Sequence, residues 1–331
     1  MAGWTDNILE GTMAEKMFID RLIDKIKKCN NATVAGLDPK LEYVPAAMRE
    51  KSFREHGAGF AGAAAAIADF NKKLIDSLCD IVPAVKPQLA YYEMYGIEGI
   101  RAFHETCSYA MSKGMLVIAD GKRNDIGTTA EAYSAAFLGK THIGENEYAA
   151  FDVDALTVNP YLGGDGIKPF TDNCSKYGKG IFVLVKTSNK SSGQFQDLLL
   201  QDGRHAYEKV AELVDDWGSA AIGETGYSSI GAVVGATWPE QAKVLRDIMK
   251  KAYILVPGYG AQGGTAKDAV NSFNDDGLGA IVNASRSIMC AWKSESWSGR
   301  YGEEAFDMAA RAEAIRMRDE INEALGKYGQ G

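Results

Sequence analysis

The chain has 331 residues, of which 46% are hydrophobic and 24% are charged, and its formal net charge is −8 at pH 7. This length allows one large domain or two average ones, and we expect a single domain over residues 1–331. The acidic balance argues against binding to nucleic acid or an anionic membrane, so an anionic substrate would need local cations and backbone amides.

Short apolar runs rich in β-branched residues alternate along the chain with longer helical patterns. The runs are too continuously apolar for half-exposed strands, which favours a parallel sheet covered by helices. Eight such repeats without a Pro- or Ser-rich linker favour an α/β fold of the (β/α)8 TIM barrel type over an open, doubly wound sheet. The predicted strands are Ala32–Leu37, Ile81–Lys86, Met115–Ala119, Ala155–Asn159, Gly180–Val185, Ile230–Gly235, Tyr253–Val256 and Gly279–Val282.

The segments between and around these strands predict helices. In Phe60–Leu78, four apolar residues recur on one helical face, and polar residues such as Asn71 lie off it. We expect extra helices before Val34 and after Met289 to pack on the barrel ends.

Two polar stretches follow the fifth predicted strand. Thr187–Gln196 is too long for a typical βα loop, and its polar composition is typical of a mobile cover over an active site. The segment Gln194–Ser229 is interpreted as a long insertion before the sixth strand.

The five cysteines are scattered and form no Cys-x-x-Cys pair, which predicts reduced, mostly buried thiols in a cytoplasmic protein. The first residues, MAGWTDNILEGTMAEK, lack the basic and apolar regions of a secretory signal. No segment reaches the roughly 20 apolar residues that a membrane span needs. We therefore expect a soluble, cytoplasmic protein that has no membrane partner.

Charged and amide residues follow most of the predicted strands. A TIM barrel places its chemistry at the carboxyl ends of its strands, where the βα loops begin. Each of these residues has an ordinary structural explanation, but their joint occurrence at one rim predicts a site there. In chain order the strand ends read LDPK, VKPQ, ADGKRND, TVNPY, KTSN, PGYGAQGG and NASRS.

The last two strand ends predict a phosphate site. The glycines of Gly258–Gly264 expose backbone N–H groups, and Arg286 supplies a planar donor suited to phosphate oxygens. Loops after the seventh and eighth strands are where barrels commonly bind phosphate. Gln262 adds an amide donor. Taken alone, the glycine-rich loop is equally compatible with a surface turn.

The third strand end carries most of the charge. Because side chains alternate along a strand, Asp120 and Lys122 are expected to point together into the barrel mouth. Lys86 and Asp38 come from neighbouring strand ends, and such an array would keep Lys122 protonated. Asp125 lies beyond the strand, so it must reach in by a turn or act elsewhere.

Less specific interpretations stay open from the residues alone. Asp120 and Lys122 could form a structural ion pair, and Arg123 and Asn124 are interpreted as solvated turn residues. The sequence contains no His-x-His or HExxH spacing and no Gly-x-Ser-x-Gly turn, which argues against a histidine-bound metal and against acyl transfer.

The motif DGKRNDIGTTA resembles the Asp-x-Lys-x-x-Asp-Ile-Gly signature of orotidine 5′-phosphate decarboxylases. The other strand ends agree in order, and the similarity to the longer, bacterial-type subgroup extends over most of Val34–Met289. The resemblance implies conversion of orotidine 5′-phosphate to uridine 5′-phosphate and CO₂, with neither a metal nor an organic cofactor.

The resemblance also implies roles for the charged array. Lys122 would protonate C6 of the pyrimidine after CO₂ leaves, and Asp120 would lie against the departing carboxylate. Lys86 would orient the array and bond the ribose, together with Asp38.

In this family the second motif aspartate enters from the partner subunit. Asp125, with Ile126 and Thr129, would therefore complete the neighbouring site in a homodimer with shared active sites.

For the rest of the nucleotide, the resemblance implies that Ser188 reads the pyrimidine edge. Gln262 and Arg286 would grip the phosphate, and Asn159 would be a ligand neighbour with no assigned contact.

Two alternatives remain. A hexulose-phosphate synthase-like aldolase shares the Asp-x-Lys-x-x-Asp strand end but needs Mg²⁺, and Lys86 and the Thr-Ser-Asn loop argue against it. A non-catalytic nucleotide-binding barrel would retain Gln262 and Arg286 but would not need Asp120 and Lys122 together.

Overall fold

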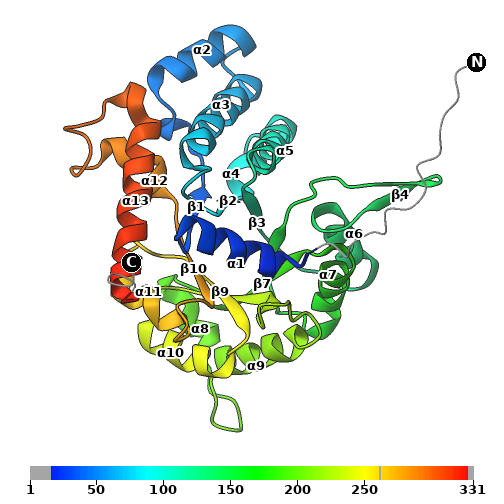
Figure 1. Ribbon diagram of the computed structural model, residues 1–331. Helices are drawn as coiled ribbons and strands as arrows, with labels where there is room; N and C mark the ends of the chain where they lie inside the picture. Colours follow the sequence, from blue (N-terminus) through cyan, green and yellow to red (C-terminus); the bar gives the residue numbers. More distant parts are fainter. Residues whose placement is uncertain (1–15, 261, 327–331) are drawn as a thin grey trace, which may run out of the picture.

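The computed structural model describes residues 16–260 and 262–326. Eight parallel strands close into a barrel in the order β1-β10-β9-β8-β7-β6-β3-β2 (Figure 1). All eight predicted strands are present, which confirms the (β/α)8 TIM barrel. Their bounds are β1 Thr33–Leu37, β2 Ala84–Pro87, β3 Leu116–Arg123, β6 Ala155–Val158, β7 Gly180–Lys186, β8 Ser228–Val234, β9 Ala252–Val256 and β10 Ala280–Ala284.

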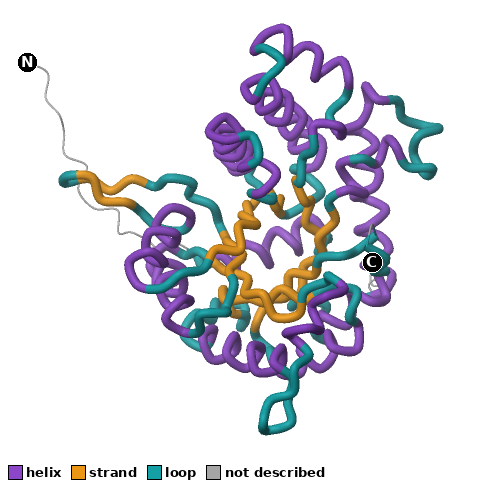
Figure 2. Tube along the Cα trace, turned by 180° about the vertical axis from the view of Figure 1, so that it is seen from behind, coloured by secondary structure: helices purple, strands orange, loops and turns teal. Residues whose placement is uncertain are grey.

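Helices surround these strands on the outside (Figure 2). Apolar side chains of a strand therefore face either the barrel interior or a helix, which explains why the strands are almost uniformly apolar. The helices are α1 Phe18–Cys29, α2 Ala46–His56, α3 Phe60–Leu78, α4 Ala90–Glu93, α5 Gly96–Ser112, α6 Gly127–Phe137, α7 Gly164–Tyr177, α8 Gly193–Gln196, α9 Ala206–Gly218, α10 Pro239–Ile248, α11 Ala266–Ala269, α12 Arg286–Met289 and α13 Phe306–Ala324.

Helix α3 has the predicted bounds, but the expectation that Asn71 lies off its buried face is wrong. Asn71 is fully buried, and its Nδ2 donates to Tyr92 Oη at 2.8 Å and to Thr106 Oγ1 at 3.1 Å. A polar side chain is tolerated in such a position when hydroxyl partners face it. Helical periodicity carries no signal for such partners, because they come from later in the chain.

The two terminal helices occupy different places. Helix α1 covers the amino ends of the strands: Phe18 packs edge-to-face on Phe182 of β7, and Asp20 accepts bonds from the backbone before β8. Helix α13 instead runs along the outside of the barrel beside α3, where Phe306 stacks on Phe70 at 4.8 Å. The expected end-packing is confirmed for α1 and is wrong for α13, which fills the place of the eighth barrel helix.

The segment Gln194–Ser229 contains α9, the helix that any (β/α)8 barrel needs between its fifth and sixth strands, and the first residues of β8. Its additional length therefore lies in the connections on either side of α9. The hairpin of β4 (Thr141–Ile143) and β5 (Asn146–Tyr148) has no counterpart among the predicted elements, and it projects from the barrel after α6 (Figure 1).

All five cysteines are free thiols, and Cys107 and Cys174 are buried whereas the other three are half-buried. Among residues 16–260 and 262–326, no helix is long and apolar enough to cross a membrane. The expectation that the chain begins without a secretory signal concerns residues 1–16, of which the first fifteen lie outside the described part of the chain.

Candidate active site

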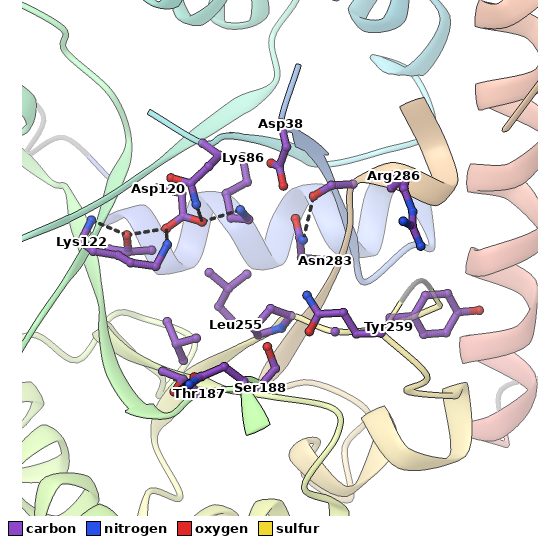
Figure 3. A pocket seen from close by; sticks show the side chains of 18 of the residues that line it. Asp38, Lys86, Asp120, Lys122, Thr187, Ser188, Leu255, Tyr259, Asn283 and Arg286 are labelled. Atoms are coloured by element: carbon purple, nitrogen blue, oxygen red, sulfur yellow. Dashed lines mark hydrogen bonds and ion pairs between the residues drawn. The ribbon is translucent and has the colours of Figure 1, made fainter. Parts of the chain in front are cut away.

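A cavity of about 710 Å³ opens at the carboxyl ends of the barrel strands (Figure 3). It brings together side chains that are far apart in the sequence, and many of them were predicted to belong to the site. Seven of the predicted residues line it: Asp38, Lys86, Asp120, Lys122, Ser188, Gln262 and Arg286. The rim predicted from the strand ends is therefore the place where these side chains converge.

Asp120 is the centre of one wall of the cavity. Its Oδ2 accepts bonds from Lys86 Nζ at 2.6 Å and Gln88 Nε2 at 3.0 Å. Its Oδ1 accepts bonds from Lys122 Nζ at 2.7 Å and Thr157 Oγ1 at 2.8 Å (Figure 3). Four donors fix the position of this carboxylate, and two of them are the ammonium groups of Lys86 and Lys122.

The side chain of Lys122 reaches this wall through a bulge, not through regular alternation. Two extra residues of β3 lie between the pairs Ala119–Leu156 and Arg123–Val158. Lys122 has a left-handed backbone with φ of +48°, and its N–H donates to Thr157 Oγ1 at 3.0 Å. A non-glycine residue in this region carries strain of about 1 kcal/mol, and such strain is concentrated at functional sites. The expected direction of Lys122 is confirmed, although the expected reason is incomplete.

Burial and charge oppose each other in this array. The side chains of Lys86 and Asp120 are only 5% and 9% exposed. Burial alone would raise the pKa of Asp120, but the positive charges of Lys86 and Lys122 outweigh it and hold that pKa well below its ordinary value. Burial would lower the pKa of Lys86, but Asp120 and Asp38 together raise it above its ordinary value. Both groups are therefore charged at neutral pH.

The opposite wall comes from the loops after β7, β9 and β10. Gly258 has φ of +96°, a left-handed conformation that favours glycine. A side chain placed on Gly258 would lie 3.3 Å from Gln262 Oε1 and 3.4 Å from Ser188 Cβ, so the loop passes close to both predicted ligands. Arg286 begins α12 and lines the cavity beside them. Ala261, inside the same glycine-rich loop, lies outside the described residues.

Four predicted residues do not line the cavity. Asp125 bonds locally, accepting from the backbone N–H of Ile126 at 2.8 Å, and the Ile126 side chain is 55% exposed. Thr129 is exposed on α6. Asn159 Oδ1 accepts from the N–H of Tyr161 at 3.0 Å and so closes a local turn.

The interpretation of Arg123 and Asn124 as solvated turn residues is wrong. Arg123 belongs to β3, and its guanidinium donates to Glu93 at 2.6 Å and to the carbonyl of Gly121 at 3.0 Å. The amide atoms of Asn124 are buried. Neither is a freely solvated turn residue, since the Arg123 side chain is only 23% exposed and the Asn124 amide is buried.

Several residues that line the cavity were not predicted from the sequence. Gln88 and Thr157 bond Asp120 directly, and Asn283 lies on the wall near Arg286 (Figure 3). Each of them belongs to a strand end that was quoted as polar, namely VKPQ, TVNPY and NASRS. Their positions were therefore the available signal, but an uncharged side chain gave no reason to select them.

This arrangement can hold an anionic ligand across two walls. An arginine and an amide stand on one side, and a fixed ammonium–carboxylate array stands on the other. Preorganised ammonium groups in a partly dry cavity stabilise negative charge that develops on a reacting atom. The Lys122 side chain is 44% exposed and lines the cavity, so it remains accessible to a ligand there.

Comparison with known proteins connects this chain to one family. Residues 62–296 match the family model described as "Orotidine 5'-phosphate decarboxylase / HUMPS family". An orotidine 5′-phosphate decarboxylase of Caldicellulosiruptor saccharolyticus is 41% identical over 308 residues, which are 93% of this chain and 99% of that protein. One from Rhodopirellula baltica is 42% identical over 304 residues, which are 92% and 98% of the two chains.

Solved structures give the same connection. The crystal structure of a putative orotidine 5′-phosphate decarboxylase from Streptomyces avermitilis has a TM-score of 0.74 at 28% identity, and the match covers 97% of this chain and all of that one. The Leishmania donovani OMP decarboxylase has a TM-score of 0.70 at 29% identity, with 94% and 99% of the two chains covered.

Proposed function

The chain belongs to the orotidine 5′-phosphate decarboxylase / HUMPS family. We propose that Lys122 is the acid that protonates C6 of the pyrimidine when the enzyme decarboxylates orotidine 5′-phosphate. The activity itself follows from the family and from relatives of that name over most of the chain. The enzyme is a carbon–carbon lyase that forms uridine 5′-phosphate and CO₂ in pyrimidine biosynthesis.

The chemical difficulty of the reaction explains what Lys122 would do. Departure of CO₂ leaves a carbanion at C6 with no conjugated electron sink, so the protein must stabilise the charge. The observation that carries the proposal is the distance of 2.7 Å between Lys122 Nζ and the buried carboxylate of Asp120. This contact positions an accessible ammonium before the substrate arrives, and the same ammonium can then give its proton to C6.

The two walls suggest how the nucleotide lies. The phosphate would bind Gln262 and Arg286, and the pyrimidine edge would face Ser188, all of which line one cavity with the charged array. The ribose would lie near Asp38 and Lys86. Binding energy from the phosphate can then serve the chemical step by holding the base against the array.

We further propose that the working enzyme is a homodimer in which Asp125, Ile126 and Thr129 of each chain complete the cavity of the other. Two facts support this. None of the three lines the cavity of its own chain. Large apolar side chains are also exposed on and beside this segment: Ile126 is 55% exposed, and Leu162, which like Asp125 lies against Gly166, is 47% exposed. Such a patch is typical of a protein–protein contact.

The main alternative is a Mg²⁺-dependent aldolase, because the family description also names HUMPS. The names of the relatives favour decarboxylation. The experiment is to follow the absorbance of orotidine 5′-phosphate with protein that has been treated with EDTA. Full activity supports decarboxylation without a metal, whereas inactivity that Mg²⁺ restores would support the alternative.

We also propose that the reaction takes place in the cytoplasm, since all five cysteines are free thiols. Cell fractionation with an activity assay tests this placement, and activity confined to a membrane or secreted fraction would contradict it.

A further inference from the structure

A second buried lysine, outside the cavity, lies at the end of β7. Lys186 is the last residue of this strand, and its side chain is 0% exposed. Regular alternation would turn Lys186 to the side of Leu184, which lines the cavity. The pairing of β7 with β8 shifts between these two residues, however, and this bulge directs Lys186 away from the cavity toward the helical layer.

The Lys186 ammonium has one charged partner and three other neighbours. Its Nζ donates to Asp197 Oδ1 at 2.5 Å and to Ser192 Oγ at 3.4 Å. It also lies 4.5 Å from the ring centroid of Trp238 and 5.4 Å from that of Tyr207. Replacing a buried ion pair with apolar side chains is often neutral or stabilising for the folded protein. Stability alone therefore does not explain why a lysine occupies this position. The contacts that the ammonium makes are the better guide to its role.

The two polar partners of Lys186 flank α8. Ser192 precedes this short helix and Asp197 follows it. The last residue of α8, Gln196, lines the cavity, and its amide bonds back to the start of the loop: Oε1 accepts from Thr187 N at 3.0 Å and Nε2 donates to Thr187 Oγ1 at 2.9 Å. Holding Ser192 and Asp197 therefore fixes where Gln196 lies.

Trp238 connects the Lys186 ammonium to Thr187, at the start of the loop Thr187–Gln196. Trp238 faces the Lys186 ammonium with its ring, and its Nε1 donates to the carbonyl of Thr187 at 2.9 Å. The next residue, Ser188, lines the cavity (Figure 3). The ammonium thus contacts the two residues that flank α8 directly, and it reaches the start of the loop Thr187–Gln196 through Trp238.

We propose that Lys186 is a positioning residue, whose ion pair with Asp197 holds the loop Thr187–Gln196 so that Ser188 and Gln196 face the base of the bound nucleotide. The inference rests on the proposed placement of the pyrimidine beside Ser188. It assigns a purpose to a buried charge that touches neither the cavity nor the Asp120 array. It also predicts that loss of the pair impairs recognition of the base and spares recognition of the phosphate.

The test compares two ligands that share a phosphate and a ribose but differ in the base. Uridine 5′-phosphate carries the pyrimidine, and ribose 5-phosphate lacks it. In Lys186→Met, which keeps most of the length of the side chain without its charge, we expect uridine 5′-phosphate to bind about tenfold more weakly. Ribose 5-phosphate should bind as it does to the unmodified enzyme, and kcat/KM should fall by about 100-fold.

The partner residue supplies a second route to the same result. The Asp197 side chain is 39% exposed, so Asp197→Asn should fold normally and show the same selective loss. Asp197→Glu keeps the charge, and we expect it to restore most of the affinity for uridine 5′-phosphate. Failure of Glu to restore affinity would overturn the role of the ion pair.

A matched control lies at the other end of the same strand. Lys179 precedes β7, its side chain is 10% exposed, and it pairs with Asp152 at 2.8 Å. Lys179→Met should leave both affinities unchanged. Equal loss of both ligands in Lys186→Met, or the same selective loss in Lys179→Met, would overturn the proposal, as would unchanged binding of uridine 5′-phosphate. The unmodified enzyme is assayed separately with orotidine 5′-phosphate, so failure of the proposed function would be distinguishable.

Discussion

The two halves of the Asp120–Asp125 motif differ in their surroundings. Asp120 and Lys122 lie in the cavity, and Asp120 accepts bonds from four side chains of the same chain. Asp125, three residues after Lys122, bonds only to its own neighbour among the described contacts, and the adjoining Ile126 is exposed. The first half is bonded within one chain, whereas the second is exposed, and we propose that it completes the cavity of a partner subunit.

The largest expected effect comes from the complete half. Lys122→Ala removes the ammonium that would stabilise and protonate C6, so decarboxylation should fall by about 10³-fold or more. Uridine 5′-phosphate should still bind, because Gln262 and Arg286 stand on the opposite wall. Absorbance assays and calorimetry measure the two quantities. Lys168→Ala, at an exposed lysine on α7, is the control, and full activity of Lys122→Ala would refute the proposed acid.

The second prediction concerns the exposed half. Asp125→Ala should reduce kcat/KM by about 10²-fold or more if this carboxylate completes a partner's cavity. The pocket of its own chain is made of other residues, so the melting temperature should change little. Activity within twofold of the unmodified enzyme would mean that Asp125 is a surface residue.

The charged array also predicts a pH dependence. The lowered pKa of Asp120 means that the charged carboxylate stabilises the folded array fully above its ordinary pKa of about 4. This stabilisation is lost as the pH falls through the lowered pKa. The raised pKa of Lys86 means that its ammonium stabilises the folded array fully below about pH 10. This stabilisation is lost as the pH rises through the raised pKa. We therefore expect kcat at saturating substrate to be flat between about pH 5 and pH 9. A titration within that range which Asp120→Asn removes would contradict the pKa of this carboxyl group.

The smallest effect should come from a charge inside the same motif. Arg123 is directed to Glu93 and away from the cavity, and Glu93 is 44% exposed. Arg123→Met should therefore leave kcat unchanged and should lower the free energy of unfolding by about 1 kcal/mol or less. Thermal unfolding and the absorbance assay test both parts. A large loss of activity would show that the motif cannot be divided between catalytic and structural charges.

Much of the barrel could be predicted, because strand periodicity and composition are local properties. All eight strands and the bounds of α3 were obtained in this way. The place of α13 could not be predicted, since it depends on contacts between Phe306 and Phe70, which are far apart in the sequence. The hairpin of β4 and β5 was missed because its strands have three residues each and are exposed, so they lack the apolar signal.

Charged members of the site were easier to predict than neutral ones. Asp120, Lys122 and Lys86 stand out because a carboxylate and two ammonium groups at strand ends are unusual in sequence. Gln88 and Thr157 bond the same carboxylate, but an amide or hydroxyl after a strand is common in any barrel. The bulge at Lys122 was also out of reach, because the pairing of β3 with β6 sets it.

Mixing two inactive variants tests the central claim that the motif is divided between subunits. After exchange of Lys122→Ala with Asp125→Ala, half of the dimers are hybrids and each hybrid has one intact site. We therefore expect about a quarter of the unmodified activity to return. No recovery, when subunit exchange has been confirmed with labelled chains, would contradict the account and place the action of Asp125 within its own chain.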